Sequence, residues 1–133
     1  MIHEFDPAIY PTRLWVTKDA TREEMRETFY FLDDKDEVVD DPQLAEGSRL
    51  PYASTYAVAH KENHWMGCLV VIWLPRRCGV DNVAHEASHC TDYLCDHLGV
   101  NGFNWDGGEA RAYYLGWAAK CINNVLKDIK NKD

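Results

Sequence analysis

Hydrophobic positions recur at helical spacing in two long segments of the second half of the chain. The apolar face of the first segment carries Val83, Ala87, Cys90, Leu94 and Leu98. The apolar face of the second carries Leu115, Ala118, Ile122, Val125 and Ile129. A repeat of this period predicts amphipathic helices, one beginning near residue 81 and one running from about residue 106 to 130, each with one face in a core.

Three further segments have the composition of β-strands. Residues 53–59 alternate between two faces, whereas residues 65–74 are almost continuously apolar, as expected of a central strand buried on both sides. Residues 60–64 between them predict a hairpin turn. Residues 9–17 are rich in β-branched and aromatic side chains, and Pro11 favours an edge strand or the first residues of a strand.

A shorter helix is predicted over residues 22–32, because Thr21 and Glu24 form a capping box and apolar residues follow at helical spacing. Residues 33–50 are then strongly acidic, which is typical of a solvated, mobile loop. A functional alternative is a flap near an active-site cleft that disfavours acidic substrates. Together these elements predict an α+β fold, in which a small, mostly antiparallel sheet packs on the helix near residue 81 and on a long C-terminal helix.

Length, charge and cysteine spacing disfavour several classes of protein. The 133 residues predict one domain, residues 1–133, with 46% hydrophobic residues and a net charge of −8. The negative charge argues against nucleic acid or an anionic membrane as the main partner. The N-terminus does not resemble a signal peptide, and the apolar stretch 68–75 is too short to span a bilayer, so a cytoplasmic location is expected. The five cysteines have no paired spacing, which disfavours a disulfide framework.

The candidate chemistry lies on the polar edge of the first long helix, where His85, Glu86 and His89 form the pattern HExxH. With His85 at zero, His89 falls at roughly 40° on a helical wheel and Asp92 at roughly −20°, so both imidazoles point from one face. Glu86 would lie beside a zinc ion held by the pair, where a carboxylate can take a proton from bound water. Asp92 either accepts a hydrogen bond from a ligand imidazole or is an exposed carboxylate.

Glu109 is the candidate for a third ligand. It follows His89 by twenty positions and lies opposite the apolar face of the second long helix. Gly107 and Gly108, directly before it, allow a close backbone approach. The alternative is a first-turn glutamate that closes a capping box with Asp106.

The HExxH pattern, followed after nineteen residues by Glu109, resembles the gluzincin branch of the zincin metallopeptidases. The segments VAHEASHCTDYL and GGEARAYYLGW are similar to short zincin-like proteins often carried by phages and prophages, and more distantly to the peptidase domain of regulators that cleave phage-type repressors. The resemblance covers residues 53–120. It implies His85, His89 and Glu109 as zinc ligands, Glu86 as general base, and residues 54–60 as the strand edge that binds substrate backbone.

Many larger gluzincins use a downstream histidine or tyrosine to stabilise the oxyanion. Candidates here are Tyr113 and Tyr114 on the second long helix, and His60 and His64 at the hairpin. Tyr113 is preferred, because its position four residues after Glu109 places it over the metal. Packing against the first long helix is the alternative for either tyrosine.

Two other ligand sets fit less well. The metzincin pattern requires glycine at position 92 and histidine at position 95, where this chain has Asp92 and Cys95. Peptide deformylases combine HExxH with a cysteine in a Gly-Cys-Leu strand, which Cys68 matches superficially. However, the interval from Cys68 to His85 is short and the glutamine-bearing loop of that family is missing, so Cys68 is predicted to be a core residue.

The sequence therefore predicts a zinc-dependent hydrolase, a metallopeptidase that cleaves a peptide or protein substrate by Glu86-assisted attack of zinc-bound water. Two alternatives remain. One is a zincin-shaped binding or regulatory protein of phage or prophage origin without peptidase activity. The other is a zinc hydrolase acting on a non-peptide bond.

Overall fold

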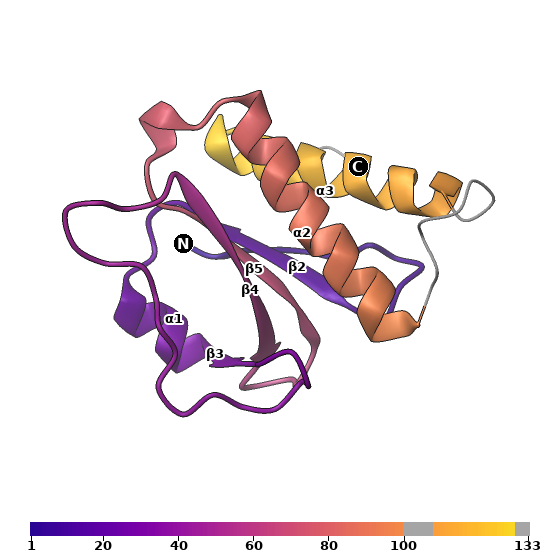
Figure 1. Ribbon diagram of the computed structural model, residues 1–133, viewed down its shortest axis with the longest axis horizontal. Coiled ribbons are helices and arrows are strands. Elements are labelled where there is room, and N and C mark those ends of the chain that lie inside the picture. The colour runs from indigo at the N-terminus through magenta and orange to yellow at the C-terminus, as the bar shows by residue number, and fades with distance from the viewer. Residues whose placement is uncertain (100–107, 130–133) are drawn as a thin grey trace.

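The computed structural model describes residues 1–99 and 108–129. Over these residues the chain forms one five-stranded sheet and three α-helices (Figure 1), which confirms the predicted α+β class. The strands are β1 (His3–Phe5), β2 (Arg13–Thr17), β3 (Phe29–Phe31), β4 (Ala53–His60) and β5 (Met66–Ile72). The helices are α1 (Arg22–Thr28), α2 (Val80–Leu98) and α3 (Gly108–Leu126), and a single 3-10 turn, η1 (Pro75–Arg77), precedes α2.

The sheet has the order β1-β2-β5-β4-β3, with β5 in the centre as its continuous apolar sequence predicts. β5 is parallel to β2, and the other three pairings in the described part of the chain are antiparallel. The parallel pairing depends on Gly67, which lies opposite Arg13. A Cβ atom at position 67 would lie 1.8 Å from the Arg13 carbonyl oxygen, so a larger residue would force the two strands apart.

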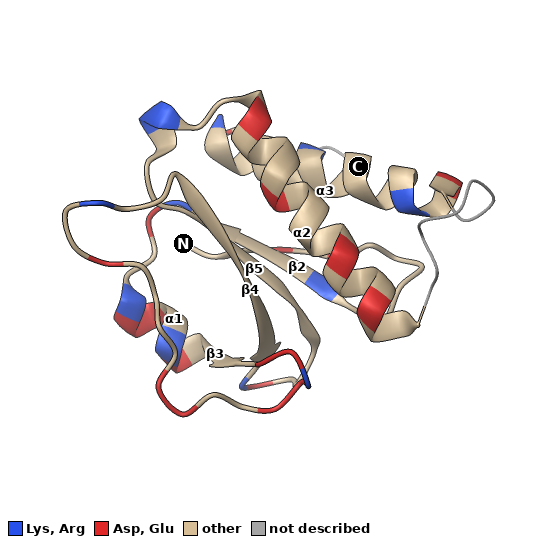
Figure 2. Ribbon diagram, in the orientation of Figure 1, with Lys and Arg blue, Asp and Glu red and all other residues tan. Residues whose placement is uncertain are grey.

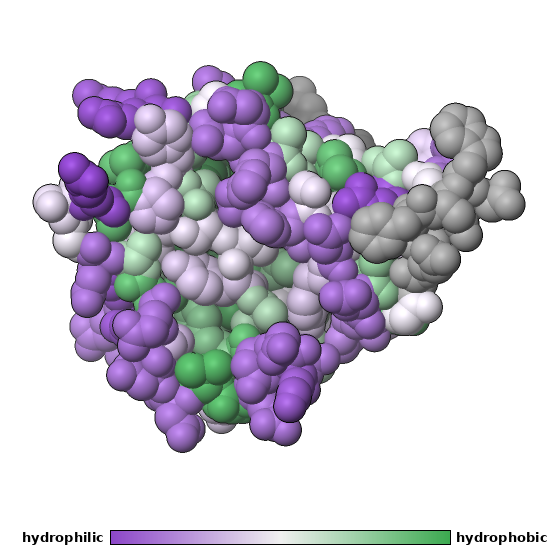
Figure 3. Space-filling view, in the orientation of Figure 1, coloured by the Kyte–Doolittle hydropathy of each residue, from purple (hydrophilic) through white to green (hydrophobic). Residues whose placement is uncertain are grey.

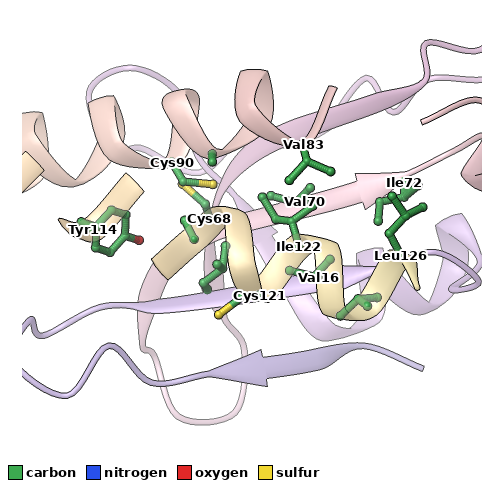
Figure 4. Close-up of a cluster of buried hydrophobic side chains, with 14 of the residues drawn as sticks. Val16, Cys68, Val70, Ile72, Val83, Cys90, Tyr114, Cys121, Ile122 and Leu126 are labelled. Atoms are coloured by element: carbon green, nitrogen blue, oxygen red, sulfur yellow. The ribbon is translucent and has the colours of Figure 1, made fainter. Parts of the chain in front are cut away.

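The two sheet faces are covered by different helices. α2 and α3 lie over one face, and α1 lies over the other (Figure 1). Alternate residues of β5 serve the two cores, since Val70 and Ile72 pack under α2 and α3 whereas Leu69 and Val71 pack with α1. Figure 4 shows the first of these clusters, in which side chains of α2 and α3 meet those of β2 and β5. The two long helices thus bury most of the apolar positions that their spacing predicts. The exception is Ile129, because α3 ends at Leu126, before the predicted end near residue 130, and Ile129 is 53% exposed.

The helix predicted over residues 22–32 is wrong beyond Thr28. The Thr21 capping box is present, but the chain leaves the helix at Phe29 and pairs with β4 as β3. Phe29 and Phe31 are buried and Tyr30 between them is exposed, so this stretch has the period of a strand. Burial of both phenylalanines against β4 outweighs the helical preference of the preceding residues.

The strand predicted over residues 9–17 is shorter than expected and is not at an edge. β2 begins at Arg13, two residues after Pro11, and β1 pairs with it antiparallel. β1 itself was not predicted, because three residues give too short an alternation to recognise.

Most residues of the acidic segment 33–50 are exposed, as expected of the solvated loop that its composition predicts, but the segment is attached to the body of the protein at several points. Leu44 is buried in the α1-side core, and the Arg22 guanidinium donates hydrogen bonds to the Ala45 carbonyl. Near its start, Leu32 forms a β-bridge with Val38. The predicted start of the second long helix at residue 106, with its possible Asp106 cap, lies outside the described residues.

Candidate metal and hydrolase site

Residues that cap a helix are present at both ends of α2. The Asn82 side chain accepts a hydrogen bond from the Gly79 backbone N–H before the first turn, and Gly99 ends the helix with a φ of 67°. The residues between have one buried face and one exposed edge. His85 and His89 lie on that exposed edge, opposite the residues that pack on the sheet.

The two imidazole rings converge. Their Nε2 atoms lie 3.1 Å apart, and the rings are nearly perpendicular with centroids 4.7 Å apart. In a tetrahedral zinc site with Zn–N distances of about 2.0–2.1 Å, two ligand nitrogens are separated by roughly 3.3 Å. The separation of the two Nε2 atoms is therefore close to that of two ligands in a zinc site. Without a metal, the same geometry allows a single N–H···N hydrogen bond between neutral rings.

Glu86 lies under the histidines, on the side of α2 that faces the sheet. It is only 5% exposed, and its Oε1 accepts a hydrogen bond of 2.9 Å from the hydroxyl of Thr55 on β4. The other carboxylate oxygen lies 4.0 Å from His85 Nε2. A carboxylate at this depth needs such partners, because burial without them would disfavour the charged form.

A cleft of about 440 Å³ opens between α2 and the first half of β4. The cleft is lined by residues of α2, β4 and β5. These residues are Ala53, Ser54, Thr55, Ala57, Cys68, His85, Glu86, His89 and Tyr93. Figure 3 shows this face, where a pale, weakly polar surface lies between the hydrophilic side chains of α2 and those of the loops opposite. The candidate catalytic groups thus line an open cleft beside a strand.

The outer edge of β4 is divided into two halves. β3 pairs with Val58–His60, and the Leu32 N–H bonds the Ala57 carbonyl. The expectation that the whole edge 54–60 is open to substrate is therefore wrong for its second half. In the described part of the chain no strand pairs with residues 53–56 on that side, and this half borders the cleft.

Glu109 and Tyr113 are not part of this cleft. Glu109 is exposed in the first turn of α3, and Tyr113 is 76% exposed. Across residues 1–99 and 108–129, no set of three His, Cys, Asp or Glu side chains comes close enough together to hold a metal ion. The structure brings His85, Glu86 and His89 together, and it leaves the assignment of Glu109 as third ligand a prediction.

Asp92 has a partner that sequence reasoning missed. Its carboxylate accepts a hydrogen bond of 2.8 Å from the Arg111 guanidinium, which joins α2 to the beginning of α3. No hydrogen bond between Asp92 and either imidazole is present.

Thr55 is the second residue that was missed. By the alternation of residues 53–59, Thr55 shares one face of the strand with Ala57 and Ala59, and a polar side chain in that row could have indicated a contact with the buried Glu86.

The other candidates for the oxyanion site lie elsewhere. Tyr114 is 5% exposed in the core beneath α2, where its ring contacts Tyr10 and Trp117. His60 packs against Trp15 and Phe29 on the sheet face that carries α1. The sheet therefore separates His60 from the histidine pair.

Cys68 is a core residue, as predicted. It is 2% exposed and lies beside Cys90 of α2 (Figure 4). A hydrogen bond with Cys90, together with burial, raises the pKa of the Cys68 thiol well above its ordinary value.

Comparison of the chain with protein-family models, curated proteins and solved structures found no match. None of the helices in the described residues has the length and apolar character needed to span a bilayer.

Proposed function

We propose that this protein is a zinc-dependent hydrolase of the zincin type that cleaves peptide bonds. The main support is the pairing of His85 and His89, whose Nε2 atoms lie 3.1 Å apart, with the buried carboxylate of Glu86 beside them in one cleft. His85 and His89 would hold the metal ion, with Glu109 as the proposed third ligand. Zinc, when bound, would polarise the amide carbonyl and lower the pKa of a coordinated water.

Glu86 would be the general base. Its carboxylate is held by the Thr55 hydroxyl, which limits its rotation and orients its free oxygen toward His85. From this position it would take a proton from the attacking water and pass it to the departing amine. Thr55 is a positioning residue in this scheme, because it acts through Glu86.

The open half of β4 would orient the substrate. An extended peptide could add to residues 53–56 as a further strand, and its backbone would then cross the cleft next to Glu86. Main-chain hydrogen bonds of this kind bind many sequences, so side-chain preference has to come from the walls of the cleft.

The experiment is hydrolysis of a peptide library by zinc-loaded protein, compared with its Glu86→Gln variant. Loss of a general base lowers turnover by about 10²- to 10⁴-fold, whereas the amide should leave zinc binding intact. Glu62→Gln, an exposed glutamate in the β4–β5 turn, is the matched control and should cleave like the wild type. Equal rates for wild type and Glu86→Gln would refute the assignment.

One observation favours a second function, a zincin-shaped binding protein without peptidase activity. Within the described residues the histidine pair has no third ligand, and an incomplete site would bind zinc weakly. Under this alternative, purified protein shows no chelator-sensitive cleavage of any library peptide, and metal content measured after purification without added zinc is well below one equivalent.

A further inference from the structure

A second cavity of about 310 Å³ adjoins the candidate catalytic cleft. It lies between the last turns of α2 and the start of the acidic segment that follows β3. The residues that line it are Leu32, Asp33, Asp34, Asp36, Ala57, Tyr93, Asp96 and His97. Ala57 and Tyr93 line the candidate catalytic cleft as well, so the two spaces meet beside Ala57, directly after the open half of β4.

The charge of this side cavity is strongly negative. Four aspartates line it, and His97 is its one basic group among the described residues. Figure 2 shows the same arrangement, with acidic residues on the end of α2 and along the segment after β3. His97 Nδ1 lies 3.5 Å from Asp36 Oδ2, and the Asp34 and Asp96 carboxylates form no hydrogen bond or ion pair in the described part of the chain.

The carboxylates are held in place. Asp33 accepts backbone hydrogen bonds from Lys35 and Glu37, at 2.9 and 3.0 Å, which fixes the turn that carries Asp34 and Asp36. On the opposite wall, the His97 ring stacks on Tyr93 with an interplanar angle of 12°. The acidic walls are thus parts of ordered structure on two separate elements.

Tyr93 adds an independent observation. The residue lines both cavities, whereas its hydroxyl oxygen is buried and has no hydrogen-bond partner among the described residues. Burial and the nearby Asp36 raise the pKa of Tyr93, so the hydroxyl stays neutral and can accept a hydrogen bond from an ammonium or guanidinium group. A buried polar atom without a partner is costly, and a rotation of the Tyr93 side chain that brings its hydroxyl to a bound cationic donor would satisfy it.

We propose that the side cavity binds a lysine or arginine side chain of the peptide whose backbone lies on β4, so that the protein selects substrates with a basic residue close to the cleaved bond. This inference rests on the proposed function, because it assigns a side-chain preference to the same cleft. The long aliphatic stem of either residue would pass the half-buried Leu32 and Ala57 side chains, and its charged end would lie among Asp34, Asp96 and the Tyr93 hydroxyl.

The test is peptide binding to the Glu86→Gln variant, zinc-loaded, measured by fluorescence anisotropy. The labelled peptides are neutral hexapeptides in which one position carries either lysine or glutamine. The lysine and glutamine versions are compared at each of the positions in turn. A lysine preference is expected at one position, and each of Asp34→Asn and Asp96→Asn should reduce it by about threefold, the effect of one partly exposed ion pair. Asp41→Asn, an exposed aspartate of the same segment outside the cavity, is the matched control and should keep the full preference.

Equal affinity for lysine and glutamine peptides at every position overturns the inference, as does a preference that Asp41→Asn lowers as much as Asp34→Asn does. Hydrolysis by the wild type separates this result from the proposed function. Cleavage without a preference for a basic residue would support the hydrolase and refute the proposed role of the side cavity. Lysine-dependent binding without any cleavage supports the cavity and refutes the hydrolase.

Discussion

The two long helices have the same length and pack against each other, yet their polar edges differ. On α2, His85 and His89 converge because residues one turn apart on a single helix are neighbours wherever the helix lies, and Glu86 lies in the same cleft. On α3, Glu109 and Tyr113 are also one turn apart, but both are exposed. The Asp92–Arg111 ion pair joins the polar edges of the two helices. The relative positions of residues on one helix follow from their spacing in the sequence, whereas those of residues on two helices depend on how the helices pack.

Metal affinity gives the sharpest test of this difference. Removing a ligand imidazole by His85→Ala should weaken zinc binding by more than about a hundredfold, since even indirect partners of a ligand contribute 10- to 100-fold. Glu109→Ala should also weaken binding if α3 supplies the third ligand. Zinc competition titrations measure both, with His3→Ala on β1 as the control histidine. A Glu109→Ala affinity equal to that of the wild type would confine the site to α2.

The packing of α3 can be disturbed directly. Ala118 is fully buried in the core that α2 and α3 share, so Ala118→Leu should lower the free energy of unfolding by about 1–3 kcal/mol through overpacking. Denaturant unfolding measures this, and Ala112→Leu on the exposed side of α3 is the control. The histidine pair keeps its spacing in this variant, so zinc affinity should fall only toward that of Glu109→Ala. A variant as stable as the wild type would show that the helix interface is loosely packed.

The adjacent tyrosines of α3 give a test by pH. Burial raises the pKa of Tyr114, so the folded state keeps a phenol proton that the unfolded state releases above about pH 10. Stability from this group is therefore complete below pH 10 and lost as the pH rises further, by about 1.4 kcal/mol per pH unit. Tyr114→Phe should make the decline of the free energy of unfolding between pH 9 and 11 shallower by about 1 kcal/mol.

Tyr113→Phe is the matched control for this experiment, because the same substitution is made one residue away on the exposed side. Identical pH profiles for the two variants would contradict a buried, protonated Tyr114.

The smallest expected effect concerns the link between the helices. The Asp92 and Arg111 side chains are 49% and 22% exposed, so their ion pair should contribute only about 0.5 kcal/mol to the free energy of unfolding. A double-mutant cycle with Asp92→Asn and Arg111→Gln measures the coupling. A coupling above about 2 kcal/mol would mean that this pair, rather than apolar packing, positions α3.

Much of the fold was predictable where a pattern was long. The nineteen residues of α2 and the apolar run of β5 were recognised from their periods, and Gly99 correctly marked a helix end. Short elements were missed, because Phe29–Phe31 and His3–Phe5 have too few residues for a period to be visible. These strands exist because a neighbouring strand pairs with them, which no local rule could indicate.

The sequence by itself determined the histidine pair, since a helix fixes the direction of residues four apart, and it determined which face of each long helix is buried. Only the tertiary structure decided that Thr55 holds Glu86, that β3 closes half of the β4 edge, and that the acidic segment meets the end of α2 beside the cleft. The physical reason is the range of the interactions. Backbone hydrogen bonds within a helix act over four residues, whereas these contacts join segments that only the packing of the sheet brings together.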